Sequence, residues 1–202
     1  MGRKGIHMGN IRQPLELICR RLNQYLKASL PRSDEWVVLS NIISNDGSLY
    51  EAARDKVVMF LANIQHDTTI STFNRNVPTQ GNQYAIVTPP LYINLYLLFY
   101  ANFQDKNYPE ALDLISQVIS FFQQNPVFTH ETLPDLDPSI TKLTFEFFNL
   151  DSTALSYLMT LAGTKYLPSA YYKVRMIPFQ AGAMQGQTPA VQGHQSPEEV
   201  KD

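Results

Sequence analysis

The most apolar stretch of the chain is Leu91–Tyr100, which reads LYINLYLLFY and follows two prolines. Its odd-numbered positions are all apolar, whereas its even-numbered positions hold three tyrosines, one asparagine and one leucine. Because strand side chains alternate between faces, the pattern predicts a central strand whose apolar face packs on helices. The tyrosine face should be half-buried or meet a partner, since a phenol has an apolar body and a polar tip. A short helix is the alternative, which the prolines and the aromatic content disfavour.

Shorter apolar runs and helical periodicities predict the remaining elements. Further strands are expected at Trp36–Ile43, Lys56–Ile64, Ile140–Phe148 and Ala170–Phe179, with a short extended piece at Val127-Phe128. Helices are expected at Asn10–Leu30, Tyr108–Gln124 and Ser152–Ala162. The predicted fold class is α+β, with a single mixed β-sheet of about four main strands and about three helices packed mainly on one face.

Polar residues in front of the helices predict how each one begins. Asn10 with Gln13, and Asn107 with Glu110, have the spacing of a capping box. Asp151 is expected to cap the third helix, and the glycine at 163 to end it. The second helix is apolar around more than half of its circumference, so it either packs heavily on the sheet or touches something besides it.

Two polar segments interrupt this pattern. His66–Thr88 is rich in Asn, Thr, Gln and Gly, and a connection of this length is usually functional or disordered. It is interpreted either as a mobile loop or as a loop or extended hairpin that orders against another subunit. From Gln180 the chain has low complexity and is expected to be disordered or ordered only by a partner. The expected organisation is a flexible N-terminal arm (1–9), one domain (10–179) and a low-complexity C-terminal tail (180–202).

Composition narrows the class of protein. A chain of 202 residues with 44% hydrophobic content can bury a core without the help of disulfides or metals. The net charge of −2 disfavours a basic nucleic-acid-binding groove, and no run of about 18 apolar residues is present that would cross a membrane. The single cysteine, Cys19, lies on the apolar stripe of the first helix and is predicted to be buried rather than reactive.

The sequence contains no recognisable pattern of catalytic, cofactor-binding or metal-ligating residues. Its four histidines lack metal-ligand spacing, and the phosphate-loop, dinucleotide, nucleophile-elbow and zinc-protease motifs are missing. The segment His130–Pro138 offers carboxylates for a cation, but acidic residues in a proline-rich loop are more often simply solvated. Arg20 and Arg21 are interpreted as a solvated face of the first helix in the same way. The prediction is a protein that is not an enzyme and uses no cofactor.

Several segments in a fixed order carry a resemblance to a known family. Pro89–Phe103 reads PPLYINLYLLFYANF, and Pro109–Phe128 reads PEALDLISQVISFFQQNPVF. With WVVLSNI, KVVMFLANI and KLTFEFFNLD in the same order, the stretch from about Asn10 to Phe179 resembles the cap, or tail-terminator, proteins of phage-tail-like contractile injection systems. This resemblance implies a structural subunit that forms a sixfold ring at the distal end of the tail. Such a ring caps the inner tube, holds the last layer of sheath and fixes the length of the particle.

The same resemblance implies the partners. They are further copies of this chain in a homo-hexamer, the inner tube protein, the sheath protein and, as an option, a second related cap subunit. Neither nucleic acid nor direct membrane insertion is expected. Synthesis and assembly would take place in the cytoplasm, and the finished particle is either released from the cell or retained in it.

Residues on the tyrosine face and in the polar segments are candidates for protein interfaces. A ring contact is head-to-tail, so each subunit needs two different patches, and aromatic side chains are enriched at interfaces. The candidates are Phe73, Val77, Tyr84, Tyr92, Tyr96, Tyr100 and Phe179. The alternative function is a small cytoplasmic enzyme or ligand-binding domain that uses the tyrosine face as a pocket. A membrane adaptor is a third hypothesis, which the absence of a basic amphipathic helix disfavours.

Overall fold

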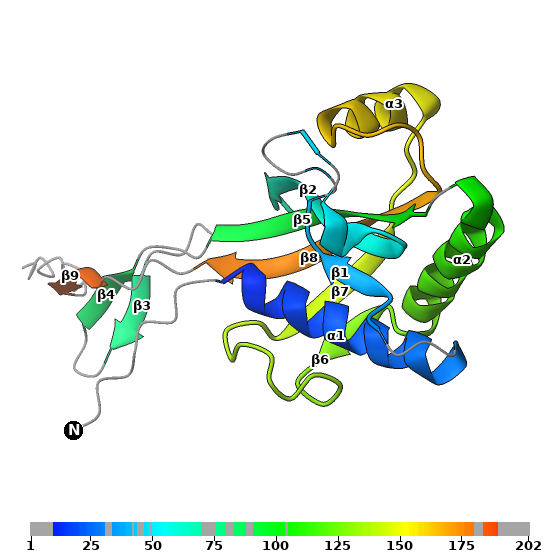
Figure 1. Cartoon of the computed structure of the whole chain (residues 1–202). Helices are drawn as coiled ribbons and strands as arrows, with labels where there is room; N and C mark the ends of the chain where they lie inside the picture. Colours follow the sequence, from blue (N-terminus) through cyan, green and yellow to red (C-terminus); the bar gives the residue numbers. More distant parts are fainter. Residues whose placement is uncertain are drawn as a thin grey trace, which may run out of the picture.

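The computed structural model describes residues 10–30, 34–41, 43, 47–48, 50–69, 76–79, 83–87, 91–103, 105–179 and 184–189. These residues form three α-helices and two β-sheets (Figure 1). The helices are α1 (Arg12–Ser29), α2 (Tyr108–Gln124) and α3 (Ser152–Leu161). The strands are β1 (Val37–Leu39), β2 (Lys56–His66), β3 (Asn76–Thr79), β4 (Gln83–Val87), β5 (Leu91–Asn102), β6 (Val127–Thr129), β7 (Lys142–Phe147), β8 (Ser169–Phe179) and β9 (Met184–Pro189).

The main sheet has six strands in the order β1-β2-β5-β8-β7-β6. β1 runs parallel to β2, and the other neighbours are antiparallel, so the sheet is mixed as predicted. The predicted α+β class and the inner position of β5 are confirmed, but the number of strands is larger than about four. The edge strands β1 and β6 have three residues each and correspond to the strand expected at Trp36–Ile43 and the extended piece expected at Val127-Phe128. The prediction of a single sheet is wrong, because three further strands form a second sheet.

One face of the sheet is covered by α1 and α2. The odd-numbered side chains of β5 from Ile93 onward point into this core, as the alternation predicted, whereas Leu91 at the start of the strand is exposed. The ring of Phe122 from α2 lies at its centre, with centroid distances of 5.1 Å to Phe99, 4.5 Å to Phe145 and 4.8 Å to Tyr172. A single aromatic side chain thus ties the helix layer to three neighbouring strands.

The other face is partly covered by α3. Leu98 and Tyr100, on the even-numbered side of β5, are fully buried in a second, smaller core together with Met159 of α3. Two helices therefore lie on one face and one on the other, which agrees with helices packed mainly on one face. The tyrosine face was predicted to be half-buried or to meet a partner. At the Leu98–Tyr100 end of β5 it is instead covered by α3.

The caps of the helices agree fully with prediction at α3 and in part at α1. The Asp151 Oδ1 accepts a hydrogen bond of 2.7 Å from the amide of Ala154, and Gly163 follows with φ of +70°. No side chain at Asn107 caps α2, so the capping box expected there is wrong. At α1 the Asn10 Oδ1 accepts from the Arg12 amide at 2.9 Å, but the second half of the expected capping box is wrong, because Gln13 turns instead to the distant 130–138 loop. Its amide donates to the Asp135 carbonyl, and its carbonyl accepts from the Asp137 amide at 3.2 Å.

A buried asparagine holds the short edge strand β1 against α1. The Asn23 Oδ1 accepts from the amides of Trp36 (2.8 Å) and Val37 (2.9 Å), and its Nδ2 donates to the Val37 carbonyl at 2.8 Å. Cys19 lies one helical turn earlier and is buried as predicted. Burial, together with the nearby charge of Glu35, raises the pKa of its thiol to about 12, so the reactive thiolate is suppressed.

Replacing Phe122 with alanine should lower the free energy of unfolding by about 3–5 kcal/mol, because the substitution opens a cavity among the rings of Phe99, Phe145 and Tyr172. The measurement is urea unfolding followed by circular dichroism. The neighbouring Gln123 is exposed, so the matched Gln123→Ala variant should change the same quantity by no more than about 0.5 kcal/mol. An equal loss in both variants would show that the ring of Phe122 is not the packing centre.

Candidate protein interface

The second sheet is a three-stranded ribbon that continues the middle of the main sheet. Its order, β3-β4-β9, repeats the order of the three long strands β2-β5-β8. Along the chain β3 follows β2, β4 precedes β5, and β9 follows β8. Figure 1 shows the ribbon lying beyond the end of β5 and β8, away from the three helices. The polar segment before the central strand and the tail after the last long strand therefore come together in one structure.

This pairing confirms one part of the prediction for the polar segments and corrects another. Within His66–Thr88, β3 and β4 form the extended hairpin that was one of the two interpretations. Whether it orders against another subunit stays a prediction. The tail was expected to need a partner for order, but Met184–Pro189 pairs with β4 of its own chain. The reason is that backbone hydrogen bonds between strands require little side-chain identity, so a low-complexity segment can form them.

The two outer strands of the ribbon leave backbone groups for a partner. Within the described part of the chain, β3 and β9 each pair on one side only, with β4 between them. An edge strand of this kind is a template for another extended segment. Pro78 in β3 has no amide hydrogen, so β3 offers one hydrogen-bond donor fewer to an added strand. β9 also has a proline, but Pro189 is its last residue, so β9 is the edge more open to strand addition.

A charged cluster lies at the root of the ribbon. Asp67, directly after β2, is buried, and its amide donates to the Tyr92 carbonyl of β5 at 2.8 Å. Arg175 of β8 lies between two carboxylates: its Nη2 is 3.4 Å from Asp67 Oδ2, and its Nη1 is 3.4 Å from Glu146 Oε1. The same Nη2 donates to the Thr69 Oγ1 at 3.1 Å. The cluster thereby joins β2, β8 and β7 where the ribbon begins.

The electrostatics of this cluster fix Asp67 as a carboxylate. Its Oδ1 accepts from the Thr69 hydroxyl at 2.5 Å and from the Thr69 amide at 2.9 Å. These bonds lower the pKa of Asp67 to about 2; burial opposes the shift, and Asn94 and Arg175 add to it. Sequence reasoning missed this cluster because nothing in the sequence links Asp67 to Arg175, which is 108 positions away.

The structure separates the predicted interface residues into groups. Phe73 lies outside the described residues. Val77 and Tyr84 lie on the adjacent strands β3 and β4, and Phe179 ends β8 opposite Leu91. Tyr92 is half-buried near the start of β5.

Tyr96 and Tyr100 are less accessible than the alternation suggested. The Tyr96 ring is buried between Phe148 (centroids 5.4 Å apart) and Tyr171 (5.9 Å). Tyr100 lies in the core under α3, and burial raises the pKa of its phenol. In this conformation neither side chain presents a free surface, so a contact of these two rings with a partner is not supported.

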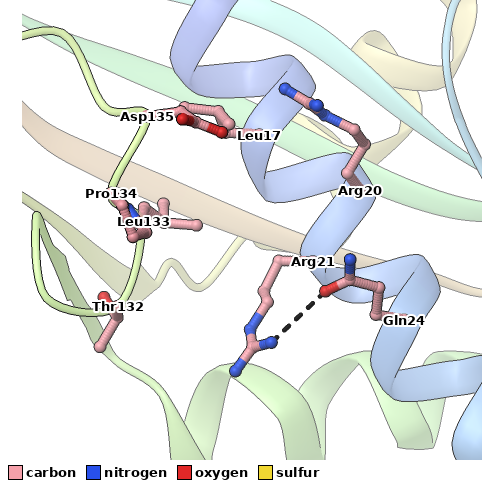
Figure 2. Close-up of a pocket in the computed structure, with 8 residues that line it drawn as sticks. All are labelled: Leu17, Arg20, Arg21, Gln24, Thr132, Leu133, Pro134 and Asp135. Carbon is pink, nitrogen blue, oxygen red and sulfur yellow. Dashed lines mark hydrogen bonds between the residues drawn. The ribbon is translucent and has the colours of Figure 1, made fainter.

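Three cavities are lined by described residues elsewhere on the molecule. One of about 220 Å³ lies between α1 and the 130–138 loop, where Figure 2 shows Arg20 and Arg21 of the helix across from Pro134 and Asp135. The other two have volumes of about 330 Å³ and 270 Å³ and lie beside α3 and α1. None of these three cavities, which are formed by described residues, is lined by Tyr92, Tyr96 or Tyr100.

Metal and membrane sites are not found in the described part of the chain. No three His, Cys, Asp or Glu side chains there gather closely enough to hold a metal ion. In the loop considered for a cation, the Asp137 Oδ1 accepts hydrogen bonds from the amide and the hydroxyl of Ser139, at 2.8 Å and 2.6 Å. None of the described helices is long and apolar enough to span a bilayer.

Comparison with known families decides the classification. The family model described as the Pvc16 N-terminal domain matches residues 16–193. This chain belongs to that family. The match includes all six strands of the main sheet, most of α1, the whole of α2 and α3, and the strands of the ribbon. A search of curated protein sequences finds no match.

Two solved structures share the fold of this Pvc16 N-terminal domain protein. One is the PVC sheath/tube terminator of an extracellular contractile injection system in its extended state, with 16% identity, a TM-score of 0.59 and coverage of 98% of this chain. The other is the anti-feeding prophage cap, a tube terminating cap, with 14% identity, a TM-score of 0.58 and 95% coverage. This chain spans 66% and 62% of the lengths of those two chains. The predicted resemblance to cap proteins is confirmed for family and fold.

Replacing Asp67 with asparagine should loosen the root of the ribbon, because the amide cannot pair with Arg175. We expect a loss of about 1–3 kcal/mol in the free energy of unfolding at pH 7. The folded-state pKa of Asp67 is lowered, so its stabilising effect is complete above the ordinary carboxyl pKa and disappears as the pH falls from about 4 to about 2.

Urea unfolding of both proteins between pH 2 and pH 7 measures this effect. The difference in the free energy of unfolding between wild type and Asp67→Asn should be constant above about pH 5 and should disappear near pH 2. The exposed Asp34 provides a control, and Asp34→Asn should follow the wild type throughout. A gap that persists unchanged at pH 2 would contradict the assigned ion pair.

Proposed function

We propose that this protein is a cap subunit of a contractile injection system. In this role it forms a ring of six copies at the distal end of the particle, terminates the inner tube and anchors the last layer of sheath. The observation that carries the proposal is the fold match over 98% of the chain to a sheath/tube terminator. Membership of the Pvc16 N-terminal domain family supports it independently.

The ribbon is the part of the chain that we assign to the contact with the tube. It projects from the end of the long strands, and its outer strands can accept an extended segment of a partner by backbone hydrogen bonding. Strand addition suits a tube terminus, because the last ring of an open-ended stack leaves one set of contacts without a neighbour. The charged cluster of Asp67 and Arg175 would hold the ribbon in a defined direction.

The partners proposed for this chain are its own copies, the inner tube protein and the sheath protein. A second related cap subunit is a further candidate for the ring that stacks on it. The particle is assembled in the cytoplasm and is either released or retained by the cell. The family comparison favours a structural role over catalysis.

The test of this function is removal of the protein from cells that assemble the particle. Without the cap, purified particles should vary in length and lose sheath at one end, as seen by electron microscopy. Particles of normal length with complete sheath would overturn the proposal.

Replacing Ala85 with proline should abolish capping and leave the domain folded. Ala85 pairs with Val77 of β3 and with Gln187 of β9, so a proline there removes an amide from the middle strand of the ribbon. Complementation with Ala85→Pro should leave particle length uncontrolled and weaken co-sedimentation with isolated inner tubes at least tenfold, or by about 1.4 kcal/mol.

The matched control is Ala85→Thr, which keeps the amide and favours strand structure, and it should restore both properties. Thermal unfolding of the proline variant should differ from the wild type by less than about 4 °C, which separates a local effect from loss of the fold. Normal capping by Ala85→Pro would exclude the ribbon from the tube contact.

A further inference from the structure

The edge strands of the main sheet, β1 and β6, carry backbone groups that point away from the sheet. Successive residues of a strand direct their amide and carbonyl groups alternately to its two sides, so every second residue of an edge strand faces outward. Outward groups without a partner are a template for the strand of another chain. Which edges of this protein can pair with a partner therefore depends on where these groups form their hydrogen bonds.

In β1 the outward groups belong to Val37 and Leu39. The carbonyl of Trp36 accepts a hydrogen bond from β2 at 2.8 Å, and the amide of Ser40 donates to β2 at 3.3 Å. Val37 and Leu39 alternate with these inward-facing groups, so their own amides and carbonyls lie on the open side of the strand. This open side faces α1.

Two side chains of α1 bind the outward groups of β1. The Val37 amide donates to the Asn23 Oδ1 at 2.9 Å, and the Val37 carbonyl accepts from the Asn23 Nδ2 at 2.8 Å. The Cys19 Sγ lies 3.5 Å from the same carbonyl and also forms a hydrogen bond with the backbone of Leu39. That bond opposes the raised pKa of the thiol, which identifies the Leu39 amide as its donor.

The side chain of Asn23 thus takes the place of a neighbouring strand. A carboxamide offers the same donor and acceptor as a peptide group, and here both are used on one residue of β1. Asn23 and Cys19 are only 5% and 8% exposed. The helix that carries them is held in the core by Ile18 and Leu22, which are fully buried. A partner strand would have to displace the helix to reach β1.

The opposite edge of the main sheet is covered by a turn. The Thr129 amide donates to the Thr132 Oγ1 at 3.0 Å, and the Thr129 carbonyl accepts from the amides of Thr132 at 3.1 Å and Leu133 at 2.8 Å. Because β6 has three residues, Val127 is the single other residue of this strand whose backbone groups alternate outward. One residue is too short a template for an added strand.

The ribbon differs from the main sheet in this respect, since β3 and β9 pair on one side only among the residues that the structure describes. We propose that Asn23 determines which edge of this protein pairs with a partner, because it closes β1 and so leaves strand addition to the ribbon. The inference rests on the proposed function for the partner that the ribbon takes. The closure of β1 itself does not depend on that function.

Hydrogen–deuterium exchange of the wild-type protein, resolved to single amides, measures the closure. The outward amides of Val37 and Leu39 should exchange about 100-fold more slowly than in an unfolded chain, or more slowly still, although they lie in an edge strand. Exchange of these two amides at the rate of an unfolded chain would show that β1 is open and would overturn the proposal.

Replacing Asn23 with alanine should open β1 and let two copies pair through this edge. The apparent mass by light scattering, measured at increasing protein concentration, should rise by about twofold or more over the wild type. The neighbouring Gln24 is exposed on the same helix, so the matched Gln24→Ala variant should keep the wild-type mass.

The double variant Asn23→Ala/Leu39→Pro separates edge pairing from misfolding. Proline at position 39 removes the outward amide, which an edge strand tolerates, so the double variant should return to the wild-type mass. A wild-type mass for Asn23→Ala alone, or an increase that persists with the proline, would contradict the proposal. Where circular dichroism shows that Asn23→Ala does not fold, the exchange of the wild-type amides decides.

The outcome is separable from that of the proposed function, because these measurements contain neither tubes nor particles. An open β1 edge in a protein that caps tubes overturns this inference and leaves the proposed function intact. A closed β1 edge in a protein whose removal leaves particle length unaffected supports the closure and overturns the role in capping.

Discussion

The burial of β5 on both of its faces is the constraint on which the rest of the structure depends. From Ile93 onward its odd-numbered side chains contact the core under α1 and α2, and Leu98 and Tyr100 contact the core under α3. A strand that is enclosed in this way needs a neighbour on each side, and β2 and β8 pair with it over most of its length. The two cores, the helices on opposite faces and the three long central strands all follow from this one element.

The same three strands explain how a compact domain carries a projecting ribbon. They end together on one side of the sheet, and the chain beyond each end contributes one strand of the ribbon in the same order. The buried carboxylate of Asp67, paired with Arg175, lies at this transition. A packed body that presents a backbone-rich extension suits a protein whose proposed task is to meet the end of a tube, since strand addition needs little sequence agreement.

Much of this architecture could be predicted from periodicity and turn residues alone. The bounds of α2, Tyr108–Gln124, and the Asp151 cap of α3 agree with prediction. The pairing of Met184–Pro189 could not be predicted, because a Gln- and Gly-rich segment has no apolar alternation to mark it as a strand. The burial of Tyr100 was missed for a different reason: the sequence does not say which face of the sheet α3 covers. Both errors concern contacts between parts of the chain that lie far apart in the sequence.

The most direct test of the account is a cryo-electron microscopy reconstruction of the distal end of the particle with this protein bound. The account predicts a single ring of six copies at the end of the tube, with the ribbon of each copy directed toward the last tube layer. Density for this chain along the length of the tube, or its absence from the end, would contradict the central claim that this protein is the cap.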